Sequence, residues 1–106
     1  ESGSAFPAFS AGAAMLERAC DVIVSMVGEL RGGMKLNAMH ALNERMQSIE
    51  SEADRLLLEL YGNMFSATAD AAQLMVRKEL FELIEKAIDR CRDAGNVIYH
   101  IALKNS

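Results

Sequence analysis

The chain has 106 residues, of which 51% are hydrophobic and 25% charged, and its formal net charge is −4. This size and composition fit a single globular domain that can bury a core of its own. No basic cluster is large enough to follow a phosphate backbone, which argues against a nucleic-acid partner, and the apolar runs are too short and too interrupted to cross a bilayer.

The composition favours an all-α fold, because Ala, Leu, Glu and Met are good helix formers and the chain has one proline. The first predicted helix covers residues 7–30, and we expect residues 1–6 to be disordered or the edge of the domain. Gly32 and Gly33 end this helix. Its apolar side chains recur every three or four residues: Leu16, Ala19, Cys20, Ile23, Met26, Val27 and Leu30.

The second predicted helix covers residues 35–64, and the third covers residues 70–103. The segment FSATAD separates them and offers Ser66, Thr68 and Asp70 as N-caps. The apolar stripe of the second helix is Met39, Leu42, Met46, Ile49, Ala53, Leu56 and Leu60. That of the third is Leu80, Ile84, Ala87, Ile88, Cys91, Ala94, Ile98, Ile101 and Ala102.

Short connections make successive helices antiparallel neighbours, so residues 7–104 are predicted to form one elongated, spectrin-like, up-down-up three-helix bundle. Most of the seven methionines fall on or near the apolar stripes, and we expect them to fill the core rather than to form an adaptable partner surface. Cys20 and Cys91 lie among apolar positions, which predicts buried, reduced thiols.

Acidic residues recur at a spacing of four on two of the predicted helices: Glu50 and Asp54 on the second, and Glu85, Asp89 and Asp93 on the third. This spacing places each set on one helix face. Antiparallel packing in a suitable register would bring the two sets together, and two such charges 4 Å apart repel by about 4 kcal/mol at an effective dielectric constant near 20. A converging cluster therefore needs protons or a cation, and all-carboxylate ligation favours magnesium, calcium, manganese or ferric iron.

The alternative is a metal-free helical interaction or oligomerisation module with solvated acidic faces. Acids at this spacing are common on exposed helix surfaces, where Arg55, Arg90 and Arg92 would neutralise them. An enzyme is not predicted, because a slim bundle lacks the cleft that paired-carboxylate catalysis needs. The sequence also has no Glu-x-x-His motif, Gly-rich phosphate loop or nucleophile–histidine pair.

Two segments carry a resemblance to a known family. The run ELFELIEKAIDRCRDAGNVIYHIALKNS resembles the end of the PhoU-like phosphate transport regulators, the accessory proteins of Pit-type phosphate transporters, and IESEADRLLLEL resembles the family's second E-x-EAD segment. The resemblance covers roughly residues 40–104. It implies the second of two homologous three-helix repeats, which would pack against a missing first repeat or form a homo-oligomer.

The resemblance also implies a function. Proteins of this family are cytoplasmic, work at the inner face of the membrane, and regulate phosphate uptake by binding a phosphate transporter or signalling protein. Related PhoU proteins hold multinuclear iron or other metal clusters on E-x-x-x-D motifs. Carried over by position, Glu50, Asp54, Glu85 and Asp89 match these motifs, and Asp93 is adjacent.

Overall fold

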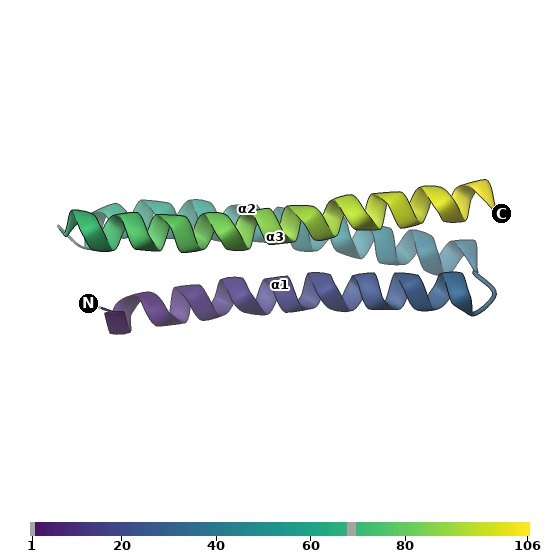
Figure 1. The fold of residues 1–106 in the computed structure, drawn as a ribbon, viewed down its shortest axis with the longest axis horizontal. Coiled ribbons are helices and arrows are strands. Elements are labelled where there is room, and N and C mark those ends of the chain that lie inside the picture. The colour runs from purple at the N-terminus through teal and green to yellow at the C-terminus, as the bar shows by residue number, and fades with distance from the viewer. Residues whose placement is uncertain (1, 68–69) are drawn as a thin grey trace.

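A computed structural model describes the backbone of residues 2–67 and 70–106 and the side chains of residues 9–63 and 70–106. Within these residues the regular structure is entirely helical and consists of α1 (Ser2–Arg31), α2 (Leu36–Ala67) and α3 (Ala71–Lys104). Each helix packs against the other two (Figure 1). The chain is therefore an all-α, three-helix structure. α1 begins at Ser2, so residues 2–6 continue the first helix.

Glycines make the tight junction between α1 and α2. The amide of Gly32 donates to the carbonyl of Gly28 at 3.0 Å, and Gly33 has a φ of 82°. A positive φ strains side-chain-bearing residues, which explains why glycine ends this helix. The carboxylate of Glu29 then accepts a hydrogen bond from the amide of Lys35 at 3.2 Å.

Asp70 caps the start of α3. Its side chain accepts hydrogen bonds from the amides of Ala72 and Gln73, at 3.0 and 3.4 Å. These amides have no partner within the helix, which is why an aspartate is favoured at this position. Of the other predicted caps, Ser66 belongs to α2, and Thr68 lies outside the described residues.

The three helices form a long, narrow body. The N-terminus and the α2–α3 junction lie at one end, and the α1–α2 junction and the C-terminus lie at the other (Figure 1). Two contacts between α2 and α3 agree with this arrangement. Near the start of α2, His40 Nδ1 lies 2.8 Å from the hydroxyl oxygen of Tyr99, near the end of α3. Further along α2, the ring of Tyr61 packs against that of Phe81 in the first half of α3, with centroids 6.2 Å apart. The body measures 55 × 18 × 16 Å, and its radius of gyration of 16.7 Å exceeds the roughly 13 Å of a compact chain of this length.

The core follows the axis between the helices in three clusters. The largest lies toward the α1–α2 junction and contains the three methionines that are almost fully buried, Met26, Met39 and Met46. The second centres on Ile84 and Ile88, and the third lies toward the α2–α3 junction. Among the side chains that the structure describes, the buried apolar ones are Met15, Ala19, Val22, Met26, Met39, Met46, Ile49, Ala53, Leu57, Phe81, Ile84, Ile88 and Ala102.

In places the buried residue is a neighbour of the residue that the apolar stripes predicted. Met15 and Val22 are buried in α1, whereas Cys20 and Val27 are exposed; in α3 the core residue is Phe81 and not Leu80. The predicted burial of the two cysteines was accordingly wrong, because Cys20 is exposed and Cys91 only partly buried, although both are free thiols as predicted. α1 and α3 carry apolar residues on more than one face, so periodicity alone leaves the centre of the buried face ambiguous.

Gly95 of α3 lies where all three helices approach one another. It is buried, and a Cβ atom at this position would lie 3.5 Å from Met26 Sδ and 3.7 Å from both Ile23 Cδ1 and Met46 Cε. The absence of a side chain therefore lets three long side chains of α1 and α2 converge on the α3 backbone.

Across the described residues, none of the helices combines the length and hydrophobicity needed to cross a bilayer.

Candidate functional site

The two acidic segments lie beside each other along the contact between α2 and α3. Four of the acids directly follow a buried residue: Glu50 after Ile49, Asp54 after Ala53, Glu85 after Ile84, and Asp89 after Ile88. One residue is a rotation of about 100° on a helix, so burial of the core residue turns the next side chain to the edge of the helix contact. The core thereby sets the position of the acids.

Arg92 joins three of the predicted site residues. Its guanidinium donates to the carboxylate of Glu50 on α2, and lies 3.2 Å from Asp93 Oδ1 and 3.7 Å from Asp89 Oδ1 on its own helix. Glu50 and Arg92 are partly buried, with side chains 20% and 33% exposed. The pKa of Arg92 is raised above its ordinary value, chiefly by the hydrogen bond to Asp93 and the charge of Glu50. Arg92 therefore stays charged and offsets one of the three negative charges of this group.

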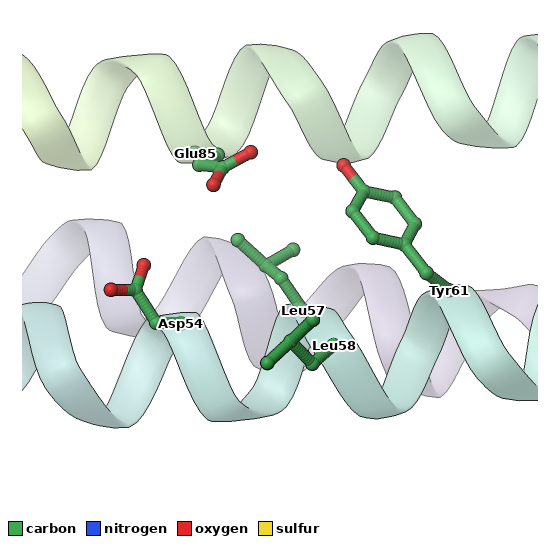
Figure 2. Close-up of a pocket in the computed structure, with 5 residues that line it drawn as sticks. All are labelled: Asp54, Leu57, Leu58, Tyr61 and Glu85. Atoms are coloured by element: carbon green, nitrogen blue, oxygen red, sulfur yellow. The ribbon is translucent and has the colours of Figure 1, made fainter.

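Asp54 and Glu85 form a second group next to the first. Figure 2 shows both carboxylates in the space between α2 and α3. Together with Leu57, Leu58 and Tyr61 they line an open surface depression of about 300 Å³. The pKa of Glu85 is raised by partial burial first, and then by the charges of Asp89, Asp54 and Glu82. The carboxylates of the two helices are thus close enough to repel one another.

Tyr61 closes one side of this depression. Its ring packs edge-on against Phe81, and Figure 2 shows its hydroxyl directed toward α3. Partial burial, followed by the charges of Glu85 and Glu82, raises the pKa of Tyr61 and keeps the phenol protonated at neutral pH. The depression therefore presents two carboxylates, one hydroxyl and two leucine side chains.

The acids are divided between these two groups. Within the described part of the chain, no three His, Cys, Asp or Glu side chains lie close enough together to hold a metal ion as they stand. Asp54 and Glu85 supply two carboxylates of the hard-oxygen type that Mg²⁺, Ca²⁺ or Mn²⁺ prefers. Glu50, Asp89 and Asp93 would add ligands only if the guanidinium of Arg92 moved away, so a cation would have to compete with Arg92 for these oxygens.

We expect Glu85→Gln to stabilise the protein at neutral pH. Because the folded-state pKa of Glu85 is raised, its ionisation opposes folding: the stability contribution is complete below the ordinary pKa of 4.5 and is lost as pH rises through the folded-state pKa. Relief of the Glu85–Asp89 repulsion at i, i+4 is worth about 0.3 kcal/mol. Urea unfolding followed by circular dichroism should show this gain at pH 7 and its disappearance below pH 4.5.

Glu79→Gln is the matched control for this substitution, because Glu79 is exposed on the same helix. The Glu79→Gln protein should not show a gain in stability at pH 7 that disappears below pH 4.5. A Glu85→Gln protein that is less stable than the parent at pH 7 would mean that the Glu85 carboxylate has a stabilising partner.

The sequence indicated which acidic residues belong to this site, but not that they separate into one group around Arg92 and a second group of Asp54 and Glu85. Arg92 was among three arginines expected to neutralise the acids, and it is the one that does so between the helices. No ion pair of Arg55 or Arg90 is found among the described residues. Tyr61 was missed; its position seven residues after Asp54, two turns along the same face, was the available signal.

Comparisons of the chain with family models, with curated proteins and with solved structures find no match.

Proposed function

We propose that this chain is a non-enzymatic regulator or accessory protein of inorganic phosphate transport, of the PhoU-like class. It would act in the cytoplasm, at the inner face of the membrane, by binding a phosphate transporter or a signalling protein. The finer fold assignment, a spectrin-like up-down-up bundle equivalent to the second three-helix repeat, belongs to the same proposal. The bundle would work as a homo-oligomer or packed against a first repeat.

The observation that carries this proposal is the alignment of the two E-x-x-x-D segments. These segments are the ones that resemble the PhoU-like family. In the folded chain they lie beside each other on α2 and α3, with Asp54 and Asp89 close enough to raise the pKa of Glu85. The repulsion between these acids opposes packing, so a positive charge at this contact would stabilise the fold.

Glu50, Asp54, Glu85, Asp89 and Asp93 are the proposed metal ligands. Asp54 and Glu85 would make the first contacts, and the other three would join when Arg92 turns outward. A bound magnesium, calcium, manganese or iron ion would neutralise the acids, clamp α2 against α3, and offer positive charge to an anion. Arg92 serves as the internal counter-ion when no metal is bound.

Removal of Arg92 tests this competition. We expect Arg92→Met to bind a hard cation such as Mn²⁺ about tenfold more tightly than the parent, because one unit of opposing charge leaves the group. Isothermal titration calorimetry and the cation-dependent rise in melting temperature measure the change. The double variant Asp54→Ala/Asp89→Ala should bind no cation. Elemental analysis should find the metal in the purified parent protein and none in the double variant.

Arg90→Met is the matched control, since Arg90 is exposed on the same helix two residues away and has no ion pair to these acids among the described residues. It should leave the cation affinity of the parent nearly unchanged. Failure of the parent, Arg92→Met and Arg90→Met proteins to bind any cation would overturn the metal part of the proposal.

The second candidate is a metal-free helical interaction or oligomerisation module. It is favoured by the ion pairs of Arg92 with Glu50, Asp89 and Asp93, and by exposed apolar side chains along α3. The latter include Val76, Leu80, Leu83, Val97 and Ile101, which recur at helical spacing. This function predicts association that strengthens with protein concentration and does not respond to cations or chelators, measured by sedimentation equilibrium.

A further inference from the structure

The two cysteines of the chain lie together on neighbouring helices. Cys20 of α1 and Cys91 of α3 are 71 positions apart in sequence, yet their sulfur atoms are 3.9 Å apart. Both are free thiols, and the chain has no third cysteine. A disulfide needs an S–S distance of ~2.05 Å. The native fold therefore brings the two sulfur atoms to within about 2 Å of this bond length.

The two thiols differ in access. Cys20 is exposed, whereas Cys91 is partly buried and packs against the core cluster that contains Met26 and Met46. The two sulfur atoms lie within hydrogen-bonding distance of each other, and either thiol can be the donor. An oxidant from solvent meets Cys20 first.

We propose that Cys20 and Cys91 form a reversible, intramolecular disulfide that fastens α1 to α3 when the protein meets a low-molecular-weight disulfide. Cys20 acts as the attacking cysteine and Cys91 as the resolving one. The site is distinct from the acidic residues at the contact between α2 and α3, and it stands whether or not those acids bind a metal.

The reaction is two thiol–disulfide exchanges. The thiolate of Cys20 attacks one sulfur of the oxidant RSSR, its S–S bond breaks, and the first RS⁻ leaves with the proton that Cys20 gave up. Cys91 then loses its proton and attacks Cys20 Sγ of the mixed disulfide, and the second RS⁻ leaves and takes up that proton. Two protein thiols are oxidised to one disulfide, and RSSR is reduced by two electrons to two RSH.

The position of this bond determines its effect. It would close a loop that contains all of α2, so it would restrict the unfolded chain strongly. It would also hold α1 and α3 together near the middle of both helices. We expect the oxidised protein to melt about 10 °C or more above the reduced protein, measured at equal protein concentration.

The test uses the full chain and 2-hydroxyethyl disulfide, a neutral oxidant that the acidic residues Glu17 and Asp21 near Cys20 do not repel. The expected product is a monomer lighter by two hydrogen atoms, with one peptide pair joined through Cys20 and Cys91 in a non-reducing digest. Added dithiothreitol should restore both thiols. A monomer that keeps two free thiols, a stable adduct at Cys20, or a disulfide-linked dimer as the main product would overturn the proposal.

Single variants separate the roles of the two cysteines. Cys91→Ser should accumulate the mixed disulfide at Cys20, because the resolving thiol is missing. Cys20→Ser should react more slowly, since Cys91 is less accessible. Equal reaction rates of the two variants would contradict the assigned order.

Denaturant tests whether the fold brings the thiols together, and it needs no variant. The ratio of disulfide to dithiol, measured at fixed concentrations of oxidant and reductant, should fall about tenfold or more in concentrated urea, where a long flexible loop separates the cysteines. An unchanged ratio would mean that the native fold does not favour this bond.

Discussion

Substitution of Met46 by alanine is expected to lower the free energy of unfolding by about 3 kcal/mol, because it removes a fully buried side chain and leaves a cavity. Met46 is 1% exposed and belongs to the largest core cluster, beside Gly95 of α3. For a domain of this size, that loss corresponds to a melting temperature roughly 15 °C lower. Urea unfolding followed by far-ultraviolet circular dichroism measures it, provided that the slope against denaturant is unchanged.

Met75→Ala is the matched control on an exposed site. Met75 lies on α3 with 64% of its surface exposed, and its replacement should change stability by less than about 0.5 kcal/mol. Equal losses for the two substitutions would mean that Met46 does not carry the packing of the core.

At Gly95, alanine and leucine should act in opposite directions. Alanine should stabilise the protein by about 1 kcal/mol, because it favours the helix and its Cβ would make ordinary contacts of 3.5–3.7 Å. Leucine should destabilise it by about 3 kcal/mol, because its further atoms have no room among Ile23, Met26 and Met46. The measurement is again equilibrium unfolding in urea.

Gly62 of α2 supplies the control, since it is exposed and a Cβ there would have no atom within 4 Å. Both alanine and leucine should stabilise the protein at this position, because both favour a helix over glycine. If the Gly95→Leu protein proved as stable as the Gly62→Leu protein, the three helices would not approach one another closely at Gly95.

Most of the all-α architecture follows from local signals in the sequence. Apolar residues at helical spacing predicted three helices, the glycine pair marked the first junction, and Asp70 was among the three N-caps proposed for α3. The exact helix ends were less predictable: α1 reaches back to Ser2 and α2 reaches Ala67. Residues at helix ends bury little surface, so the apolar pattern contains little information about them.

The core-facing side of α1 was harder to predict than the helix itself. Val22 is buried and Val27 exposed, although both are apolar and both fit a helical repeat. The choice between them depends on the neighbouring helices, which is information about packing and not about period. The same ambiguity led to the incorrect prediction that Cys20 is buried.

The candidate site shows a similar division. The spacing of the acids identified Glu50, Asp54, Glu85, Asp89 and Asp93, and the core residues before four of them explain their position at the helix contact. The role of Arg92 depends on the register of α2 against α3, because its partner Glu50 is 42 residues away. A single sequence contains no direct signal for that register.

The elongated body has a consequence for how this protein moves in solution. A body of 55 × 18 × 16 Å turns end over end much more slowly than it spins about its long axis. Backbone N–H bonds lie nearly along a helix axis, and the three helices follow the long axis (Figure 1). Nuclear magnetic relaxation of most amides would therefore report the slow rotation, and a mass derived from it under spherical assumptions would exceed that of the monomer. Amides at the α1–α2 junction, which point in other directions, would relax differently and reveal the true shape.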